Sequence, residues 1–221
     1  MAESTIPGVR FYEFVRVYHL MKSKWAMTAL RERRLKVSLL TDLNDPFECL
    51  PLNFSAHPTL RGTFHDTKQG WASIFGVVCF SRSWNDPVLW AHYADAHKGI
   101  CLGFDVPDHL LKEAVYIPKP MTLNELMACD FDVLYRAKAA RWQYEDEVRM
   151  IVQLGAPAAG GHHFVPMDGR LRLTDVILGC RCSVAITDIA EALSKHPKGV
   201  RVCRCAPAED SFDMVEGEVL M

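Results

Sequence analysis

The chain has 221 residues, 49% of them hydrophobic, and a formal net charge of -2. A chain of this length and composition can bury a full hydrophobic core, and we expect one large domain. The small net charge excludes a strong overall attraction to nucleic acid or to an anionic membrane. The basic cluster over residues 31–36 could act locally, but such clusters are more typical of a solvated helix end.

The N-terminal sequence lacks the apolar segment of a signal peptide, and no apolar run approaches the roughly 20 residues that a membrane span needs. We expect residues 1–8 to be a flexible leader and residues 9–221 to form the single domain. The expectation is a soluble, cytoplasmic protein that does not bind a membrane. Its eight cysteines are then mostly reduced, buried thiols.

The first part of the chain alternates between strand-like and helix-like segments. Aromatic and β-branched residues predict a strand over residues 11–20, and an amphipathic pattern predicts a helix over residues 24–34. The alternation in residues 35–40 predicts a strand, and Asn-Asp-Pro at residues 44–46 predicts a tight turn. Residues 51–70 lack periodicity, so we expect a loop or lid there.

The stretch from residue 76 to residue 105 is the one around which the chain is organised. It predicts a buried strand over residues 77–81, a turn, a short helix and a second buried strand over residues 100–104. Polar or aromatic side chains lie between the two apolar strands: Ser81, Ser83, Trp90, His92 and Tyr93. A plain core connection does not need this chemistry, so the stretch is a candidate wall of a binding site.

The remaining segments are short. We expect helices over residues 109–114, 123–127 and 185–196, a closing loop over 137–143, a hairpin loop over 155–161, and strands over 145–154, 173–178, 200–205 and 211–220. This order of elements, without internal repeats, predicts an α+β fold with mixed strand pairing.

Glu145 and Glu147 form the sharpest pair of chemical groups. Because strand side chains two residues apart point to the same side, we expect the two carboxylates to lie close together at a strand start. Like charges at that distance raise the pKa of one carboxyl, and such a pair can combine a general base with an electrostatic stabiliser. The alternative is a solvated edge at which Glu147 pairs with Arg149 or Arg141.

Tyr18 and His19 end the first predicted strand. A histidine in this setting is more often a satisfied structural residue than a ligand. Together with the Ser, Trp and Tyr wall and the glutamate pair, however, it completes a three-part site for a nucleotide sugar.

Metal sites are the weaker interpretation. Asp45 and Glu48 could bind a metal but are more typical of a braced turn. The C-x-C pairs at residues 180–182 and 203–205 could bind zinc if they met in space, although zinc sites usually have wider spacing. No dinucleotide, P-loop, nucleophile-elbow or H-E-x-x-H motif is present, which excludes the enzyme classes built on those motifs.

Three sequence boxes resemble those of a bacterial domain family of unassigned function. They are N-D-P-F-E at residues 44–48, C-F-S at 79–81 with W-x-H-Y-A at 90–94, and W-x-Y-E-x-E-x-R at 142–149. The likeness extends from Tyr18 to the C-terminus. The order of parts is also similar to that of the ADP-ribosyltransferase superfamily, and this resemblance implies a single domain with a mixed, split β-sheet core flanked by short helices.

The superfamily resemblance implies that NAD is the substrate and that no metal is needed. On that basis Tyr18 and His19 lie at the ribose of NAD, with His19 as its hydrogen-bonding partner, and Ser81 takes the middle-strand position. Tyr93 or Trp90 would stack on the nicotinamide.

The same resemblance makes Glu147 the catalytic glutamate that binds the nicotinamide ribose, and Glu145 a second catalytic carboxylate that deprotonates an acceptor. A carboxylate beside the ribose would stabilise the oxocarbenium-like state in which the nicotinamide bond breaks. The implied activity is ADP-ribosyl transfer or NAD hydrolysis by a toxin or defence effector. The implied partners are a protein or nucleic-acid acceptor and an antitoxin or immunity protein.

Two other functions stay open at this point. One is a metal-dependent nuclease or hydrolase that uses Asp45, Glu48 and the glutamate pair with a histidine. The other is a non-enzymatic binding module that uses a surface of Trp84, Trp90 and Tyr93.

Overall fold

The computed structural model describes residues 13–221, so the expected leader over residues 1–8 and the expected start of the first strand at residue 11 lie outside the described residues. The helices are α1 (Ser23–Glu32), α2 (Leu60–Ala72), α3 (Pro87–Tyr93), α4 (Leu123–Met127) and α5 (Ile186–Leu193), with 3-10 turns η1 (Asp108–Leu110), η2 (Phe131–Tyr135) and η3 (Ala140–Glu145). The strands are β1 (Phe14–Met21), β2 (Arg34–Leu39), β3 (Phe75–Ser81), β4 (Ile100–Pro107), β5 (Leu111–Glu113), β6 (Val115–Ile117), β7 (Ala137–Ala139), β8 (Glu147–Gln153), β9 (His163–Pro166), β10 (Arg172–Leu178), β11 (Arg201–Pro207) and β12 (Met214–Val219).

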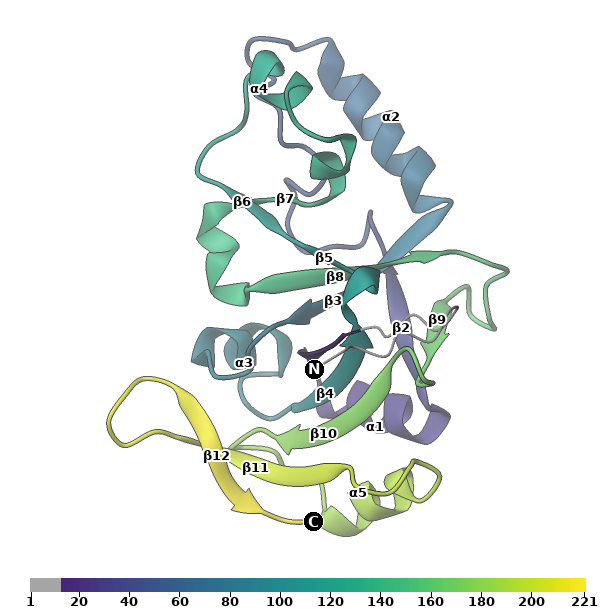
Figure 1. Cartoon of the computed structure of the whole chain (residues 1–221), viewed down its shortest axis with the longest axis vertical. Coiled ribbons are helices and arrows are strands. Elements are labelled where there is room, and N and C mark those ends of the chain that lie inside the picture. The colour runs from purple at the N-terminus through teal and green to yellow at the C-terminus, as the bar shows by residue number, and fades with distance from the viewer. Residues whose placement is uncertain (1–12) are drawn as a thin grey trace, which may run out of the picture.

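A ten-stranded sheet in the order β12-β11-β10-β4-β1-β3-β2-β9, with β8 and β5 joined beside β3, forms the centre of the molecule. The β10–β11 pair is parallel and its neighbours are antiparallel, so the sheet is mixed and the predicted α+β fold is confirmed. Figure 1 shows α2, α4, β6 and β7 beyond β8 at one end of the molecule, and β11, β12 and α5 at the other.

The two faces of the sheet bury different side chains. Along β4, Ile100 and Leu102 belong to the larger core, which also receives the apolar sides of α1 and α5. Cys101 points the other way and packs in a second core with Trp90 of α3. Each fully buried large apolar side chain contributes about 1.5–3 kcal/mol, so this alternation holds helices against both faces.

The sheet is split along one edge of β3. On its other edge β3 pairs with β8 over its whole length, from Phe75↔Gln153 to Ser81↔Glu147. On the split edge it meets β1 only at Tyr18↔Ser81, and β2 only at Val77 and Gly76. No strand within residues 13–221 pairs with Val78, Cys79 and Phe80 on that edge, and β1 and β2 diverge around them.

Several elements differ from the expectations. The strands β6 and β9 form where no strand was expected, and β7 forms within the expected closing loop over residues 137–143. Residues 60–72 form helix α2 where we expected a loop; only Ala72 of this helix is buried, which explains the missing apolar periodicity. Residues 111–113 form β5 where we expected helix, because pairing with β8 outweighs local helix propensity. No helix in the described part of the chain is long and apolar enough to cross a membrane.

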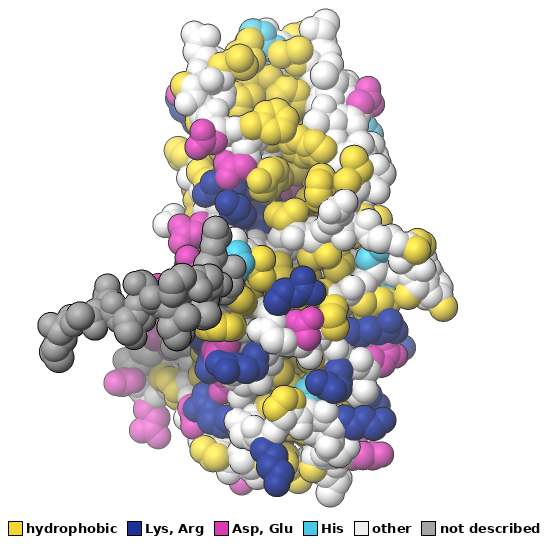
Figure 2. Space-filling view, turned by 45° about the vertical axis from the view of Figure 1, so that its right-hand side comes forward, with side chains coloured by type: hydrophobic (Ala, Val, Ile, Leu, Met, Phe, Trp, Pro, Cys, Tyr) yellow, Lys and Arg dark blue, Asp and Glu magenta, His cyan; other side chains and the backbone are white. Residues whose placement is uncertain are grey.

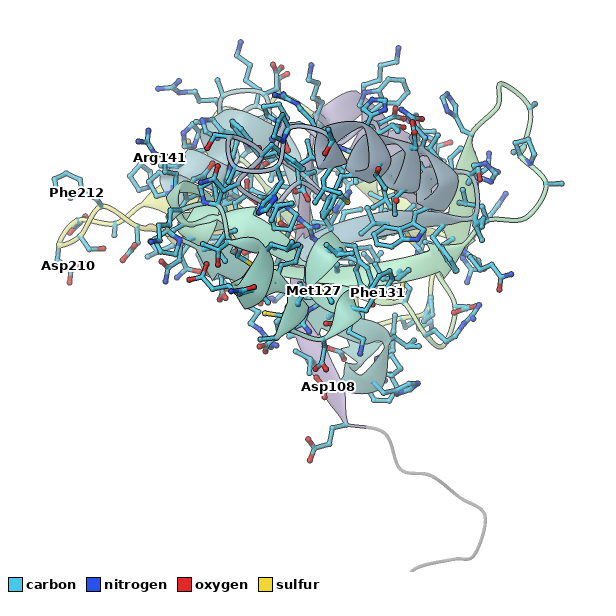
Figure 3. The ribbon with its side chains drawn as sticks, turned by 90° about the horizontal axis from the view of Figure 1, so that it is seen from above. Asp108, Met127, Phe131, Arg141, Asp210 and Phe212 are labelled. Carbon is cyan, nitrogen blue, oxygen red and sulfur yellow. The ribbon has the colours of Figure 1, made fainter. Side chains whose placement is uncertain are left out.

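Several apolar side chains project from the ends of the molecule. Phe212 is 98% exposed at the tip of the β11–β12 hairpin, and Met127 and Phe131 are 77% and 70% exposed around α4 and η2 (Figure 3). These groups lie on the periphery and do not line the cavity described below.

Candidate functional site

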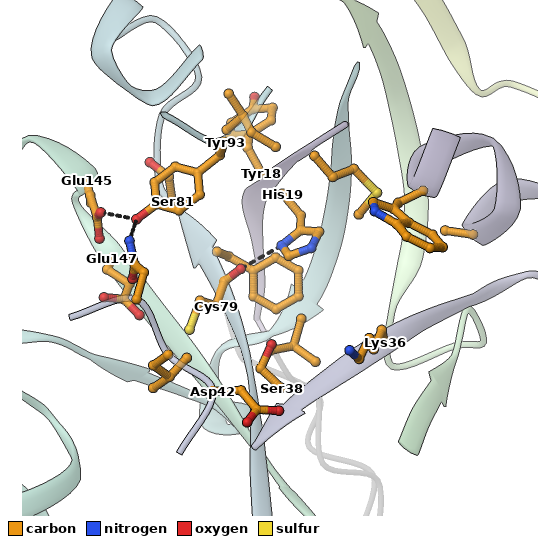
Figure 4. Close-up of a pocket in the computed structure, with 18 of the residues that line it drawn as sticks. Tyr18, His19, Lys36, Ser38, Asp42, Cys79, Ser81, Tyr93, Glu145 and Glu147 are labelled. Carbon is orange, nitrogen blue, oxygen red and sulfur yellow. Dashed lines mark hydrogen bonds between the residues drawn. The ribbon is translucent and has the colours of Figure 1, made fainter. Parts of the chain in front are cut away.

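A cavity of about 640 Å³ opens where the sheet splits (Figure 4). Side chains from β1, α1, β2, β3 and α3 line it, together with residues just before and at the start of β8. The cavity therefore draws on segments that are far apart in the sequence. Six of the seven predicted site residues line it: Tyr18, His19, Ser81, Tyr93, Glu145 and Glu147.

Three of these residues share one register across three neighbouring strands. Tyr18 of β1 lies opposite Ser81 of β3, and Ser81 lies opposite Glu147 of β8. Because directly opposed residues in a sheet have Cβ atoms about 5 Å apart, the three positions form a row at the end of the split.

Trp90 is the predicted site residue that lies elsewhere, and the expectation that it stacks on a ligand is wrong. Its side chain is fully buried in the second core, where the indole Nε1 donates a hydrogen bond of 2.7 Å to the carbonyl oxygen of Trp84. Trp84 itself is only 9% exposed. Of the three aromatic residues in the binding-module alternative, the two tryptophans are therefore core, and only Tyr93 lines the cavity.

His19 closes part of the split. Its Nδ1 lies 2.7 Å from the carbonyl oxygen of Cys79, on the edge of β3 that lacks a strand partner. A carbonyl can only accept a hydrogen bond, so Nδ1 carries the proton and Nε2 is left as an acceptor. Burial lowers the pKa of His19, which keeps the imidazole neutral. A neutral acceptor of this kind can bind a hydroxyl group.

Tyr93 is held from two sides. Its hydroxyl donates to Glu145 at 2.5 Å and accepts a hydrogen bond of 2.9 Å from the Nδ2 of Asn44 (Figure 4). Burial and the neighbouring Glu145 carboxylate raise the pKa of Tyr93, so the phenol stays protonated. These contacts fix the plane of a ring that lines the cavity.

Glu145 and Glu147 lie close together, as predicted, but a cation joins them. Lys138 Nζ is paired with Glu145 Oε2 and lies 2.7 Å from Glu147 Oε2, and all three side chains are almost fully buried. The strand starts at Glu147 rather than at Glu145, which ends η3, because Asp146 between them adopts left-handed backbone angles (φ 41°).

Arg149 forms the deepest part of this cluster. Its guanidinium is fully buried and contacts Glu147 at 2.8 Å and Glu48 at 2.7 Å. Burial alone would raise the pKa of Glu147, but Arg149 and Lys138 outweigh it and lower that pKa to about 2. The expected rise in pKa is thus wrong for Glu147. Its predicted pairing with Arg149 is present, in the interior rather than on a solvated edge.

The three sequence boxes converge on this cluster. Asn44 and Glu48 of the first box contact Tyr93 of the second and Arg149 of the third, respectively. Asp45 Oδ1 accepts a hydrogen bond of 2.9 Å from the backbone nitrogen of Phe47, as the braced turn predicts. The boxes therefore mark one spatial unit.

Lys138 is the main residue that sequence reasoning missed. It is a single lysine in the short strand β7, where we expected a loop, and neither periodicity nor a motif distinguishes it. Trp25 and Lys36, which also line the cavity, were missed as well. The alternation of residues 35–40 contained the signal for Lys36, because it places that side chain opposite the buried Leu35 and Val37.

Within residues 13–221, no group of three or more His, Cys, Asp or Glu side chains is arranged to hold a metal ion. This applies to Asp45, Glu48 and the glutamate pair, and also to the two C-x-C pairs. Cys182, Cys203 and Cys205 are buried thiols, and burial raises the pKa of each.

Comparisons of the chain with protein-family models, with curated proteins and with solved structures found no match.

Proposed function

We propose that the protein cleaves the nicotinamide N-glycosidic bond of NAD and transfers ADP-ribose to an acceptor or to water. The observation that carries this proposal is the row of Tyr18, Ser81 and Glu147 across β1, β3 and β8, at a cavity that also contains His19 and Tyr93. A neutral histidine, a fixed aromatic ring and an ionised carboxylate meet at one split in the sheet.

The charge of the buried cluster supports the same reaction. The cluster contains three carboxyl groups (Glu48, Glu145 and Glu147) and two basic groups (Lys138 and Arg149), so its acidic groups outnumber its basic groups by one. The nicotinamide ring of NAD is a cation, and positive charge moves to the ribose as the bond breaks. A low-dielectric site with fixed negative charge stabilises that state more strongly than water does.

Each residue has a role in the bond-breaking step. The ring of Tyr93 stacks on nicotinamide, and His19 Nε2 accepts a hydrogen bond from a ribose hydroxyl. The C1′–N bond breaks, its electron pair leaves with neutral nicotinamide, and Glu147 stabilises the oxocarbenium-like ribose. Because its pKa is about 2, Glu147 is fully ionised at neutral pH without help from the substrate.

The acceptor then attacks C1′ from the face that nicotinamide has not occupied. Its oxygen forms the new bond, and Glu145 takes its proton as a general base. Glu145 is within reach of this role because its carboxylate contacts Tyr93 at the cavity wall. A macromolecular acceptor would make the protein a transferase, and water would make it a glycohydrolase. Either activity suits a toxin or defence effector that an immunity partner holds in check.

The test is nicotinamide release from NAD, followed by chromatography, with and without chelator and cell lysate. The proposal expects release that survives the chelator and is lost in Glu147→Gln, while Glu218→Gln on exposed β12 keeps the wild-type rate. Dependence on lysate would identify transfer. No release by the wild type under any condition, or equal release by Glu147→Gln, would refute it.

A further inference from the structure

The end of the cavity that lies far from the glutamates has different chemistry. Figure 4 places Lys36 across the cavity from Glu145 and Glu147, with His19 between them. The helix on the Lys36 side is α1, which carries Trp25, another residue that lines the cavity. Figure 2 shows several Lys and Arg side chains over the middle and lower parts of one face of the molecule.

Lys36 is a cation that the fold does not require for an ion pair. Leu35 and Val37 point into the core, so the alternation of β2 turns Lys36 and its neighbour Arg34 toward the cavity. Arg34 is already paired with Glu32 at 2.6 Å. Lys36 is exposed and has no ion-pair partner within residues 13–221. Its ammonium is available to an anion.

Trp25 provides an aromatic surface on the wall of the same cavity. Its side chain is 56% exposed, whereas α1 is anchored in the core by Ala26 and Leu30 on its other side. The fold therefore does not need this tryptophan for packing. A partly exposed indole at a cavity wall is well suited to stacking on a nucleobase, since every base presents an apolar ring face.

We propose that this end of the cavity binds the adenosine diphosphate part of a dinucleotide, with the phosphates on Lys36 and the adenine ring on Trp25. The inference rests on the proposed function, because it places the nicotinamide end of the same molecule at Glu147. A cavity of about 640 Å³ lies within the usual range for sites that enclose a ligand of this class. Asp42 also lines the cavity, near Ser38 in Figure 4, so the phosphates lie on the Lys36 side of that carboxylate.

The experiment is calorimetric titration of ADP, which contains adenine and two phosphates but no nicotinamide. Lys36→Glu is expected to weaken ADP binding about tenfold or more, because it replaces a phosphate partner with a repelling charge. Trp25→Ala is expected to weaken it about tenfold through lost stacking. Lys195→Glu makes the same charge change at an exposed position in the turn after α5 and should bind ADP like the wild type.

Adenosine separates the two contacts. Its binding should be weakened by Trp25→Ala and left unchanged by Lys36→Glu, because adenosine carries no phosphate. The inference is overturned if the wild type does not bind ADP, or if Lys36→Glu and Trp25→Ala bind ADP as tightly as Lys195→Glu does.

This test is distinct from the test of the proposed function. If the protein releases nicotinamide but Lys36→Glu keeps the wild-type KM for NAD, the reaction stands and the assignment of this end fails. If ADP binds through Lys36 and Trp25 but nicotinamide is never released, the nucleotide site stands and the reaction fails.

Discussion

At the end of the cavity beside β8, Lys138, Glu147 and Arg149 are buried and paired, whereas at the end beside β2, Lys36 and Trp25 face solvent. The first end is part of the interior, where leaving one charge without its partner is costly. The second end contributes little to the fold, so its side chains are free for recognition. We therefore expect substitutions at the two ends to affect different properties, stability with catalysis at one and affinity at the other.

The largest effect on stability is expected for Lys138→Met. It removes the cation between Glu145 and Glu147 and leaves two buried carboxylates with one fewer partner. Breaking a buried ion pair in this way costs about 3–5 kcal/mol of unfolding free energy. Urea denaturation measures the loss, with the exposed Lys195→Met as the matched control. Equal stability of the two variants would show that the cluster is solvated.

The second prediction concerns the stability of the fold at low pH. The pKa of Glu147 in the folded protein, about 2, lies below its usual 4.5, so Glu147 stabilises the fold above pH 4.5 and loses this effect as the pH falls toward 2. The difference in unfolding free energy between wild type and Glu147→Gln should therefore reach about 3 kcal/mol near pH 6 and shrink as the pH falls.

Glu48 has the opposite effect on how the unfolding free energy changes with pH, because burial raises its pKa. For this reason the comparison uses Glu147→Gln rather than the wild-type profile alone. A difference that stays constant between pH 6 and pH 2 would contradict the account of Glu147.

A smaller effect is expected for Tyr93→Phe. This change keeps the ring that lines the cavity but removes the hydroxyl that joins Asn44 to Glu145. The loss of these hydrogen bonds should cost about 1 kcal/mol of unfolding free energy. If Tyr93 acts by stacking, Tyr93→Phe should keep most of the NAD affinity that Tyr93→Ala loses. Equal affinity of the two variants would remove Tyr93 from the binding site.

The smallest effect on stability is expected at the exposed end. Lys36→Ala and Trp25→Ala should each change the unfolding free energy by about 0.5 kcal/mol or less, since neither side chain packs in the core. Thermal melting of the ligand-free variants measures this. A loss as large as that of Lys138→Met would mean that the two ends are not distinct.

Much of the fold follows from local sequence signals. The strands that carry His19, Ser81 and Glu147 are apolar runs bounded by turn residues, and their pattern alone predicts them. Helix α2 was missed because it buries little, and β5 because it depends on pairing with β8, a contact that the local sequence does not encode.

Most of the site was predictable, from residues at strand ends such as Ser81 and Glu147 and from Tyr93 on the short helix between two strands. The Glu145 and Glu147 pair was visible in the sequence, but the effect of Lys138 on it depends on how the folded chain brings the short strand β7 into the interior. Trp90 is the opposite case, because it was predicted as a site residue and does not line the cavity. Its position on a short helix suggested a ligand contact, and only the packing of α3 on the sheet shows that it is core.

Steady-state kinetics of nicotinamide release from NAD, compared across wild type, Glu147→Gln and Lys36→Glu, tests the central claim most directly. We predict that Glu147→Gln lowers kcat by about 100-fold or more with little change in KM, because it removes a charge that acts in the transition state. Lys36→Glu should raise KM about tenfold with little change in kcat. A wild type that releases no nicotinamide, or two variants that change the same parameter, would contradict a cavity that cleaves NAD at one end and binds its nucleotide at the other.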